Sequence, residues 1–423
     1  MKVKTDIHWI LNNLKSKASE LSKKDFPLEI AHEARKFHMQ IPGYRISPLK
    51  NLNNLARMFG VGGIWIKDEA ERLELNSFKV LGGSFALYKF IQERLGLEGK
   101  ELSYEFLVSK ETKKRLGELT FASATDGNHG RGIAWAAGKL GHKCVIYVHS
   151  DTSSARIQAI RDYGATVKII KGNYDNAVHQ IVKDSEKNGW NVISDTSWDG
   201  YSTVPMWIMQ GYTTMFLETQ EQFSAQGMIK PSHIFVQAGV GALAASVIGF
   251  YHALFPGDAP ICIVVEPDNA ACLYESIQHN DGKPHNVTGS LNTIMAGLAC
   301  GEPSPIAWNI LKKTVDAFIT CPDYLAAKGM RIYATPLNGD PFIVSGESGA
   351  VTLGALISIL TEEGLGNLKT ALKLDDKSQI LLLNTEGNTD PVQFRQIIWE
   401  GSNPVPKEFF TDNREVNSNN QGK

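Results

Sequence analysis

The sequence predicts an α/β protein built from mainly parallel sheets. Runs rich in valine and isoleucine recur along the chain, and helical patterns of about ten to fifteen residues separate them. Consecutive parallel strands require such helical crossovers, which cover both faces of a sheet. The length of 423 residues exceeds one ordinary domain and favours two. We therefore expect two open, twisted sheets with helices on both faces.

The first series of strands and helices lies within residues 91–205 and is predicted to form a small α/β domain. Two helical segments, SARIQAIRDYG and YDNAVHQIVKDSEKNG, each end on a glycine, which is a common helix stop. The predicted strands of this series are TFASA (120–124), KCVIYVH (143–149), ATVKIIKG (165–172) and NVISD (191–195).

A second series begins near residue 234, and we assign residues 1–90 and 206–423 to a large domain. GYRISPL (43–49) reads as a turn and GIWIKDE (63–69) as a strand, and both can join this second series. TDNREVNSNNQGK (411–423) is polar, and we expect this tail to be disordered. The later predicted strands lie in SHIFVQAGVG (232–241), PICIVVEP (260–267), DAFITCP (316–322) and SQILLLNTEG (378–387).

The composition is that of a soluble globular protein, with 43% hydrophobic and 21% charged residues and a net charge of −2. The densest positive run, KETKKR (110–115), fits a solvated helix face, so we expect no nucleic-acid partner. GALAASVIGFYHALF (241–255) falls short of the roughly 20 residues that span a bilayer. Charges interrupt the N-terminal apolar run, so no targeting signal is visible. We expect a cytoplasmic protein without membrane contact.

The cysteines and histidines show no metal-ligand spacing, because neither CxxC nor HExxH occurs. We expect no metal site. Isolated buried thiols are the ordinary interpretation, and a bond between Cys272 and Cys300 remains the alternative. The five cysteines are Cys144, Cys262, Cys272, Cys300 and Cys321.

The segment QAGVGALAAS (237–246) follows a predicted strand and opens an apolar helix. Its GVGALA spacing matches G-x-G-x-x-A, and Glu266 ends the next strand, as in a dinucleotide site. A nicotinamide-dependent oxidoreductase is therefore one hypothesis. A glycine-lined turn at a helix N-terminus also binds any phosphate group, so the motif alone leaves both interpretations open.

Lys79, in NSFKVLGGS (76–84), has apolar neighbours that favour loss of its charge. A free amine there can attack a carbonyl and form a Schiff base, although a surface lysine is the simpler interpretation. An imine-forming lysine and a phosphate-binding turn are the two anchors that pyridoxal phosphate needs. Thr385 ends another strand, where a hydroxyl can face a heterocyclic nitrogen, although TEGNTD (385–390) also reads as a simple turn.

Long stretches resemble the fold-type II pyridoxal-phosphate family, the group of tryptophan synthase β and threonine dehydratase. Within it the chain closely resembles the ammonia-lyases of 2,3-diaminopropionate, and the resemblance covers most of the chain up to about Gly401. The resemblance implies pyridoxal 5′-phosphate in the cleft between the two domains, and a homodimer. The stretches are GYRISPL, KDEAERLELNSFKVLGG, ATDGNHGRGIAWAA, ISDTSWDGY, PMWIMQGY, QAGVGA, VVEP, TIMAGLACGEPSP, SGESGAVTLGAL and NTEGNTDP.

The resemblance also implies roles for individual residues. Lys79 resembles the lysine that forms the Schiff base, and Asn128 the asparagine that contacts the phenolic oxygen of the cofactor. Thr385 is similar to the Ser or Thr that faces the pyridine nitrogen. The backbone implied to hold the phosphate is that of Gly239, Val240, Gly241 and Ala242. The loop implied to receive the substrate carboxylate is Thr125, Asp126, Gly127, Asn128 and His129.

Asp126 departs from the dehydratases, which carry a small neutral residue there. Two unit charges ~4 Å apart repel by about 4 kcal/mol at an effective dielectric constant near 20, so a carboxylate disfavours serine or threonine as substrate. The β-ammonium of 2,3-diaminopropionate offsets this charge. Alternatively, Asp126 takes up a proton as a base. With Lys79 on one face and Asp126 on the other, both D and L isomers become substrates.

The expected reaction is elimination of 2,3-diaminopropionate to pyruvate and two ammonia, with a serine or threonine dehydratase as the alternative. Asp126 or Asp195 is expected to hold the departing ammonium. Asp195 follows a strand, so capping a helix is an equally ordinary use. Glu347 resembles a position near the cofactor ring, but it also fits the acidic first turn of a helix.

Overall fold

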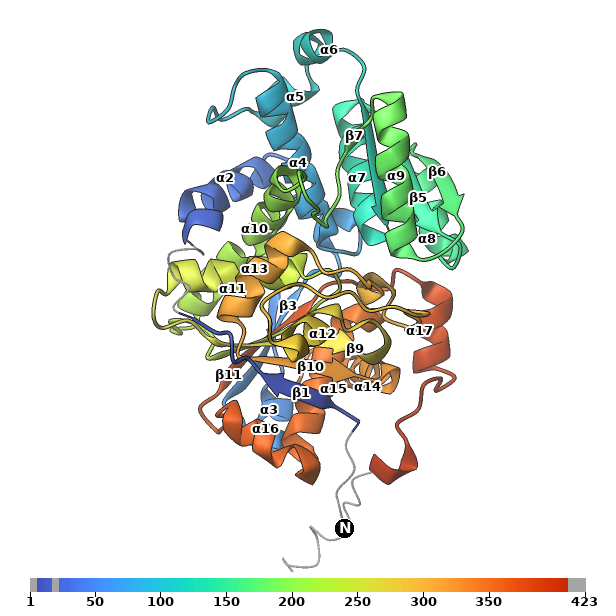
Figure 1. The fold of residues 1–423 in the computed structure, drawn as a ribbon. Helices are drawn as coiled ribbons and strands as arrows, with labels where there is room; N and C mark the ends of the chain where they lie inside the picture. Colours follow the sequence, from blue (N-terminus) through green and yellow to red (C-terminus); the bar gives the residue numbers. More distant parts are fainter. Residues whose placement is uncertain (1–5, 17–22, 126, 410–423) are drawn as a thin grey trace, which may run out of the picture.

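The computed structural model describes residues 6–16, 23–125 and 127–409 (Figure 1). Two predictions concern residues outside these ranges, the role of Asp126 and the disorder of the tail at 411–423.

A seven-stranded sheet forms the centre of the larger part of the molecule (Figure 1). Its five inner strands are parallel, and the edge strands β1 and β2 are antiparallel to their neighbours. In spatial order the strands are β1 (His8–Leu11), β10 (Ala317–Cys321), β9 (Ile261–Pro267), β8 (His233–Gln237), β11 (Gln379–Asn384), β3 (Gly63–Asp68) and β2 (Leu49–Asn51).

A four-stranded, fully parallel sheet forms the centre of the smaller part. Its strands in order are β6 (Thr166–Ile170), β5 (Lys143–His149), β4 (Thr120–Thr125) and β7 (Asn191–Val192). Helices connect these strands as crossovers, α7 (Asn128–Leu140), α8 (Ser154–Arg161) and α9 (Tyr174–Asn188). The predicted α/β class with parallel sheets is confirmed.

The strands of the small sheet all lie within the predicted small domain, residues 91–205, and the other strands lie outside it. The boundary near residue 90 falls inside a continuous helix, α4 (Lys79–Arg94), which packs on α7 and on α10 (Thr203–Ala225). Because α4 contacts elements on both sides, it lies at the junction of the two parts. The domain limits stay a prediction.

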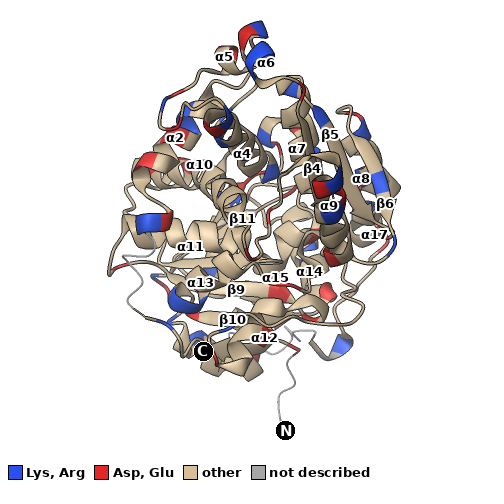
Figure 2. Ribbon diagram, turned by 45° about the horizontal axis from the view of Figure 1, so that its top comes forward, with Lys and Arg blue, Asp and Glu red and all other residues tan. Residues whose placement is uncertain are grey.

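The remaining helices surround the large sheet or extend beyond the small one (Figure 1). They are α2 (Leu28–Met39), α3 (Asn53–Phe59), α5 (Tyr104–Val108), α6 (Lys110–Leu116), α11 (Ala242–Leu254), α12 (Cys272–His279), α13 (Pro305–Thr314), α14 (Asp323–Ala334), α15 (Glu347–Thr361), α16 (Gly366–Ala371) and α17 (Pro391–Ile398). The basic run at 110–115 forms the exposed surface of α6, as Figure 2 shows.

Three strands differ from the sequence prediction. β2 begins at the end of the segment predicted as a turn and was not predicted as a strand. β1 pairs with β10 although no strand was predicted there, because a four-residue edge strand is too short for a clear period. β7 ends at Val192, so the predicted strand over 191–195 is too long. The chain leaves the sheet after Ile193, whose N–H still binds Ala122 O. Because the chain leaves the sheet at this point, Asp195 lies in the site described below.

No helix within the described ranges is long and apolar enough to cross a membrane. In the same ranges, no three histidine, cysteine or acidic side chains are grouped as metal ligands would be. All five cysteines are buried free thiols, so Cys272 and Cys300 are not bonded to each other.

Candidate active site

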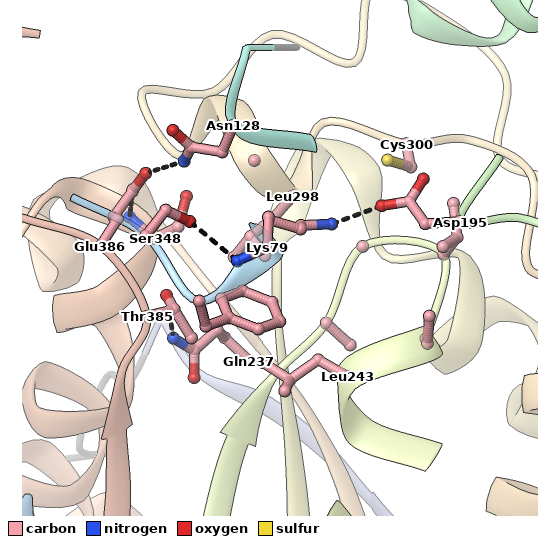
Figure 3. Close-up of a pocket in the computed structure, with 18 of the residues that line it drawn as sticks. Lys79, Asn128, Asp195, Gln237, Leu243, Leu298, Cys300, Ser348, Thr385 and Glu386 are labelled. Atoms are coloured by element: carbon pink, nitrogen blue, oxygen red, sulfur yellow. Dashed lines mark hydrogen bonds and ion pairs between the residues drawn. The ribbon is translucent and has the colours of Figure 1, made fainter. Parts of the chain in front are cut away.

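Lys79 lies in a cavity that residues of both parts of the molecule line (Figure 3). From the small part come Asn128, Tyr174 and Asp195, and from the large part come Thr385 and the turn at 239–242. Eight of the predicted site residues therefore meet in one place: Lys79, Asn128, Asp195, Gly239, Val240, Gly241, Ala242 and Thr385.

The backbone just before Lys79 is strained. Leu73, Glu74 and Asn76 have φ values of 49°, 61° and 52°, a left-handed region that residues other than glycine rarely adopt. Strain of this kind persists only where the surroundings enforce it, and it clusters at functional sites. Two backbone bonds hold the segment to the end of β11, Phe78 N–H to Thr385 O at 3.2 Å and Gly387 N–H to Asn76 O at 3.0 Å. The first turn of α4 is thereby fixed beside Thr385.

A buried ion cluster anchors the start of the strained segment. Arg72 donates from Nε to Glu69 Oε2 at 2.7 Å and from Nη2 to Glu218 Oε2 at 2.7 Å. Lys67 Nζ lies 2.8 Å from the same Glu218 oxygen, and all four side chains are buried. Removing one partner from such a cluster is costly, because it leaves an uncompensated buried charge. The cluster therefore fixes β3 and the segment after it to α10.

Lys79 Nζ donates to Asp195 Oδ2 at 2.5 Å (Figure 3). The other oxygen, Oδ1, accepts from Tyr174 OH at 3.1 Å, and His129 Nδ1 lies 3.9 Å from Oδ2. Asp195 thus contacts the lysine instead of capping a helix. Burial alone would raise the pKa of the Asp195 carboxyl, but His129 and the Lys79 ammonium outweigh burial and hold that pKa below its ordinary value. Asp195 is therefore a carboxylate at neutral pH.

The turn at 239–242 leads from β8 into α11, whose N-cap is Gly241. Gly241 has φ +98°, and a Cβ there would lie 3.1 Å from Leu311 Cδ1. A Cβ on Gly239 would lie 3.1 Å from Cys300 Sγ. Both positions therefore need glycine, for conformation at one and for space at the other. The free N–H groups at the start of α11 form an anion site at the cavity wall.

Thr385 follows β11 and is held by Gln237, whose Nε2 donates to Thr385 Oγ1 at 2.9 Å and to Leu383 O at 3.1 Å (Figure 3). Because the hydroxyl oxygen accepts this bond, the hydroxyl hydrogen is left to donate elsewhere. Gln237 Oε1 and Ser348 Oγ also border the cavity, and neither has a hydrogen-bond partner within the described ranges. Unpaired buried polar atoms of this kind indicate a polar ligand.

Asn128, the first residue of α7, donates from Nδ2 to Glu386 Oε2 at 2.5 Å (Figure 3). The sequence interpretation found Asn128 but missed Glu386, although an acidic residue directly after Thr385 at a strand end was the available signal. It also missed Tyr174, Gln237 and Ser348, whose local sequences carry no motif.

The described residues of the 125–129 loop differ in whether they reach the cavity that contains Lys79. Thr125 is buried, and its hydroxyl oxygen accepts from Gly127 N–H at 2.9 Å and Gly130 N–H at 3.0 Å. His129 is bonded through Nε2 to Ile193 O at 3.0 Å. Among the described residues of this loop, Asn128 alone borders the Lys79 cavity. Thr125 and His129 thus shape the loop, and Asp126 lies outside the described residues.

Two acidic residues of the sequence interpretation lie elsewhere. Glu347 begins α15 and lines a separate cavity with Arg156 and Asp390; burial and the charge of Glu386 raise its pKa to about 7. Glu266 is fully buried, and its carboxyl group accepts from the N–H groups of Leu273 and Tyr274 at 2.8 and 2.7 Å. Both carboxyl oxygens of Glu266 are therefore engaged by the start of α12 and cannot bind a ribose. For this reason the hypothesis of a nicotinamide-dependent oxidoreductase is wrong.

The site fits pyridoxal phosphate. The cavity holds an amine, Lys79, and an anion site at the start of α11, which suit an aldehyde and a phosphate group respectively. A hydroxyl and an amide, Thr385 and Asn128, border the space between these anchors. Those are donors that a ring nitrogen and a phenolic oxygen can use.

Comparisons with known proteins agree with this fit. Residues 41–386 match the family model described as pyridoxal-phosphate dependent enzyme. Diaminopropionate ammonia-lyases of Salmonella typhimurium and Escherichia coli are each 44% identical over 88% of this chain and 92% of their own length. The crystal structure of the Escherichia coli enzyme in complex with D-serine has a TM-score of 0.88 and 39% identity, and the match covers 96% of this chain and 100% of that one. The chain therefore belongs to the pyridoxal-phosphate dependent enzyme family.

Proposed function

We propose that the protein is a carbon–nitrogen lyase that converts 2,3-diaminopropionate and water to pyruvate and two ammonia. The observation that carries the proposal is the Lys79–Asp195 pair, which places a carboxylate beside the reactive amine. The similarity to diaminopropionate ammonia-lyases over 92% of their length supports the same substrate.

The protein's own residues would hold pyridoxal 5′-phosphate from four sides. Lys79 would bind its aldehyde and the 239–242 turn its phosphate, while Asn128 would donate to its phenolic oxygen. Thr385 would donate its free hydroxyl hydrogen to the ring nitrogen. When bound, the cofactor serves as an electron sink that acidifies the substrate α-hydrogen. Because a neutral hydroxyl does not protonate the ring nitrogen, Thr385 limits charge delocalisation and favours elimination over transamination.

Two groups would take the α-proton. The Lys79 amine, when it is not bonded to the cofactor, would act as base on one face. Asp126 is proposed as base on the opposite face, because it follows Thr125 in the loop that ends at Asn128. Opposed bases let one enzyme process both isomers.

The leaving group determines the preference for a diamine. A β-nitrogen leaves as ammonia only if it is protonated first, and 2,3-diaminopropionate brings this proton as its ammonium. The substrate ammonium would take the place of the Lys79 ammonium beside Asp195, and His129 and Tyr174 remain there to favour the ionised carboxylate. The enamine that remains is hydrolysed, which releases pyruvate and the second ammonia.

Product stoichiometry tests this function. We expect the holoenzyme to release two ammonia per pyruvate from both isomers of 2,3-diaminopropionate. Serine and threonine would give one ammonia per oxo acid at a much lower rate, because a hydroxyl brings no cation for Asp126 or Asp195. Faster turnover of serine or threonine than of the diamine would identify a dehydratase instead.

We further infer a cytoplasmic homodimer. Free thiols at all five cysteines suit a reducing compartment. Met58 and Phe342 are 59% and 56% exposed, and Ile46 and Leu337 are also exposed. Lys50 Nζ donates to Phe342 O at 3.2 Å, so the two segments that carry these side chains are adjacent. An exposed apolar patch favours self-association. Light scattering should give about twice the chain mass of 46.6 kDa.

A further inference from the structure

We infer that Glu386 is a positioning residue that locks the Asn128 side-chain amide as a hydrogen-bond donor toward the cofactor. This inference rests on the proposed contact between Asn128 and the phenolic oxygen. The two side chains come from different parts of the molecule, since Asn128 begins α7 beside the small sheet and Glu386 follows β11 of the large sheet. They meet at 2.5 Å at the edge of the cavity that contains Lys79 (Figure 3).

The Glu386 carboxylate is itself held from several directions. Its side chain is buried, with 1% of its surface exposed. Oε1 accepts from Ser348 N–H at 3.2 Å, in the first turn of α15, where the helix dipole favours a negative charge. Oε2 accepts from Thr389 Oγ1 at 3.3 Å as well as from Asn128. The bridge between Ser77 and Glu386 fixes the backbone at the same point. The Glu386 carboxylate is therefore held in one position and can fix the orientation of the Asn128 amide that it contacts.

A carboxylate determines which way the asparagine amide faces. An ionised carboxylate only accepts hydrogen bonds, so the amide nitrogen of Asn128 must face it. A flipped amide would set two oxygens against each other at 2.5 Å. The nitrogen keeps a second hydrogen, and its direction is fixed once the first is engaged. The charge-assisted bond also exceeds a neutral one in strength. Asn128 therefore cannot turn its carbonyl toward a ligand oxygen that carries negative charge.

Glu386 also contributes charge to this corner of the cavity. Its charge is one of the causes that raise the pKa of Glu347, after burial. Glu386 and Lys79 line the same cavity, so the negative charge of Glu386 should favour a cation at Lys79. Removing the charge while keeping the side-chain shape should therefore lower the pH at which the visible absorption band of the holoenzyme changes.

The test compares Glu386→Ala, Glu386→Gln and Asn128→Ala with the double variant Glu386→Ala/Asn128→Ala. The two readouts, taken without substrate, are the dissociation constant for pyridoxal 5′-phosphate and the pH midpoint of the visible band. Glu363→Gln, on an exposed residue, is the matched control. Because no substrate is present, the result is independent of the ammonia-to-pyruvate ratio that tests the proposed function.

We expect Glu386→Ala and Asn128→Ala each to weaken cofactor binding about tenfold, in line with loss of a hydrogen bond to a charged group. The double variant should be no weaker than either single variant. Glu386→Gln retains an acceptor oxygen, so it should restore most of the affinity but lower the pH midpoint. Wild-type affinity in Glu386→Ala, or multiplying effects in the double variant, would overturn the inference. If Glu386→Ala does not fold, wild-type cofactor affinity in Asn128→Ala overturns the inference alone, because the amide that Glu386 holds would then make no contact with the cofactor.

Discussion

Lys79 Nζ and Asp195 Oδ2 lie 2.5 Å apart although 116 residues separate them in the chain. Lys79 begins a helix next to the large sheet, and Asp195 lies just beyond the last strand of the small sheet. The pair thus joins the two parts of the molecule inside the cavity. When the Lys79 amine is neutral and acts as a base, the Asp195 carboxylate needs another cation, and a diamine substrate supplies one.

Asp195→Asn should lower kcat/KM for 2,3-diaminopropionate by about 30-fold or more, since loss of one member of a buried charged pair costs at least about 2 kcal/mol. The loss should be smaller with serine, which has no second ammonium. Steady-state kinetics on both substrates measure the difference. Asp199→Asn, on an exposed residue of the same loop, is the control. Equal losses on the two substrates would contradict the role of Asp195 in holding the leaving group.

Asp126→Asn should reduce turnover of D-2,3-diaminopropionate about 100-fold more than that of the L isomer, because loss of a general base costs at least that factor. Separate assays with each pure isomer check this expectation. Asp162→Asn, an exposed position, should leave both rates unchanged. If Asp126→Asn affected both isomers equally, the division of the two bases between opposite faces would be wrong.

Local patterns in the sequence predicted the five inner strands of the large sheet and the four strands of the small sheet, because buried parallel strands read as continuous apolar runs. The place of Thr385 in the cavity followed from the rule that strand ends in open α/β sheets face the ligand crevice. Lys79 and the 239–242 turn were joined to it as the two anchors that pyridoxal phosphate needs and by the family resemblance. The role of Asp195 could not be predicted from the sequence, since an aspartate after a strand can equally cap a helix.

Contacts between distant segments were not predictable. Asn128 and Glu386 meet across 258 residues, and no period or motif links them. β1 pairs with β10 across a similar distance. The burial of Glu266 at the start of α12 also depends on tertiary packing, and for this reason the dinucleotide motif was ambiguous in the sequence.

Gly241→Ala should destabilise the fold by about 1–2 kcal/mol, because φ +98° is unfavourable for a residue with a Cβ. It should also weaken cofactor binding, since the added carbon would push the 239–242 turn away from Leu311. Gly257→Ala is a matched control, with φ +80° and open space around it. It should show a comparable loss in denaturant unfolding but normal cofactor affinity. Unchanged cofactor affinity in Gly241→Ala would argue against a phosphate site at the turn.

Glu266 should make stability depend on pH. Burial raises its pKa from an ordinary 4.5 to about 8, although the two backbone donors oppose this. The stabilising contribution of the protonated group is complete below about pH 4.5 and is lost as the pH rises toward 8. Urea unfolding at pH 5 and pH 8.5 should therefore show a larger loss for the wild type than for Glu266→Gln. Parallel losses in the two proteins would mean that Glu266 is ionised in the folded state.

The most direct test of the account is chemical capture of the bond at Lys79. Reduction of the holoenzyme with borohydride, followed by digestion and mass spectrometry, should place a phosphopyridoxyl group on Lys79, and Lys79→Ala should carry none and should lack activity. A phosphopyridoxyl group found on another lysine, or full activity in Lys79→Ala, would contradict the central assignment.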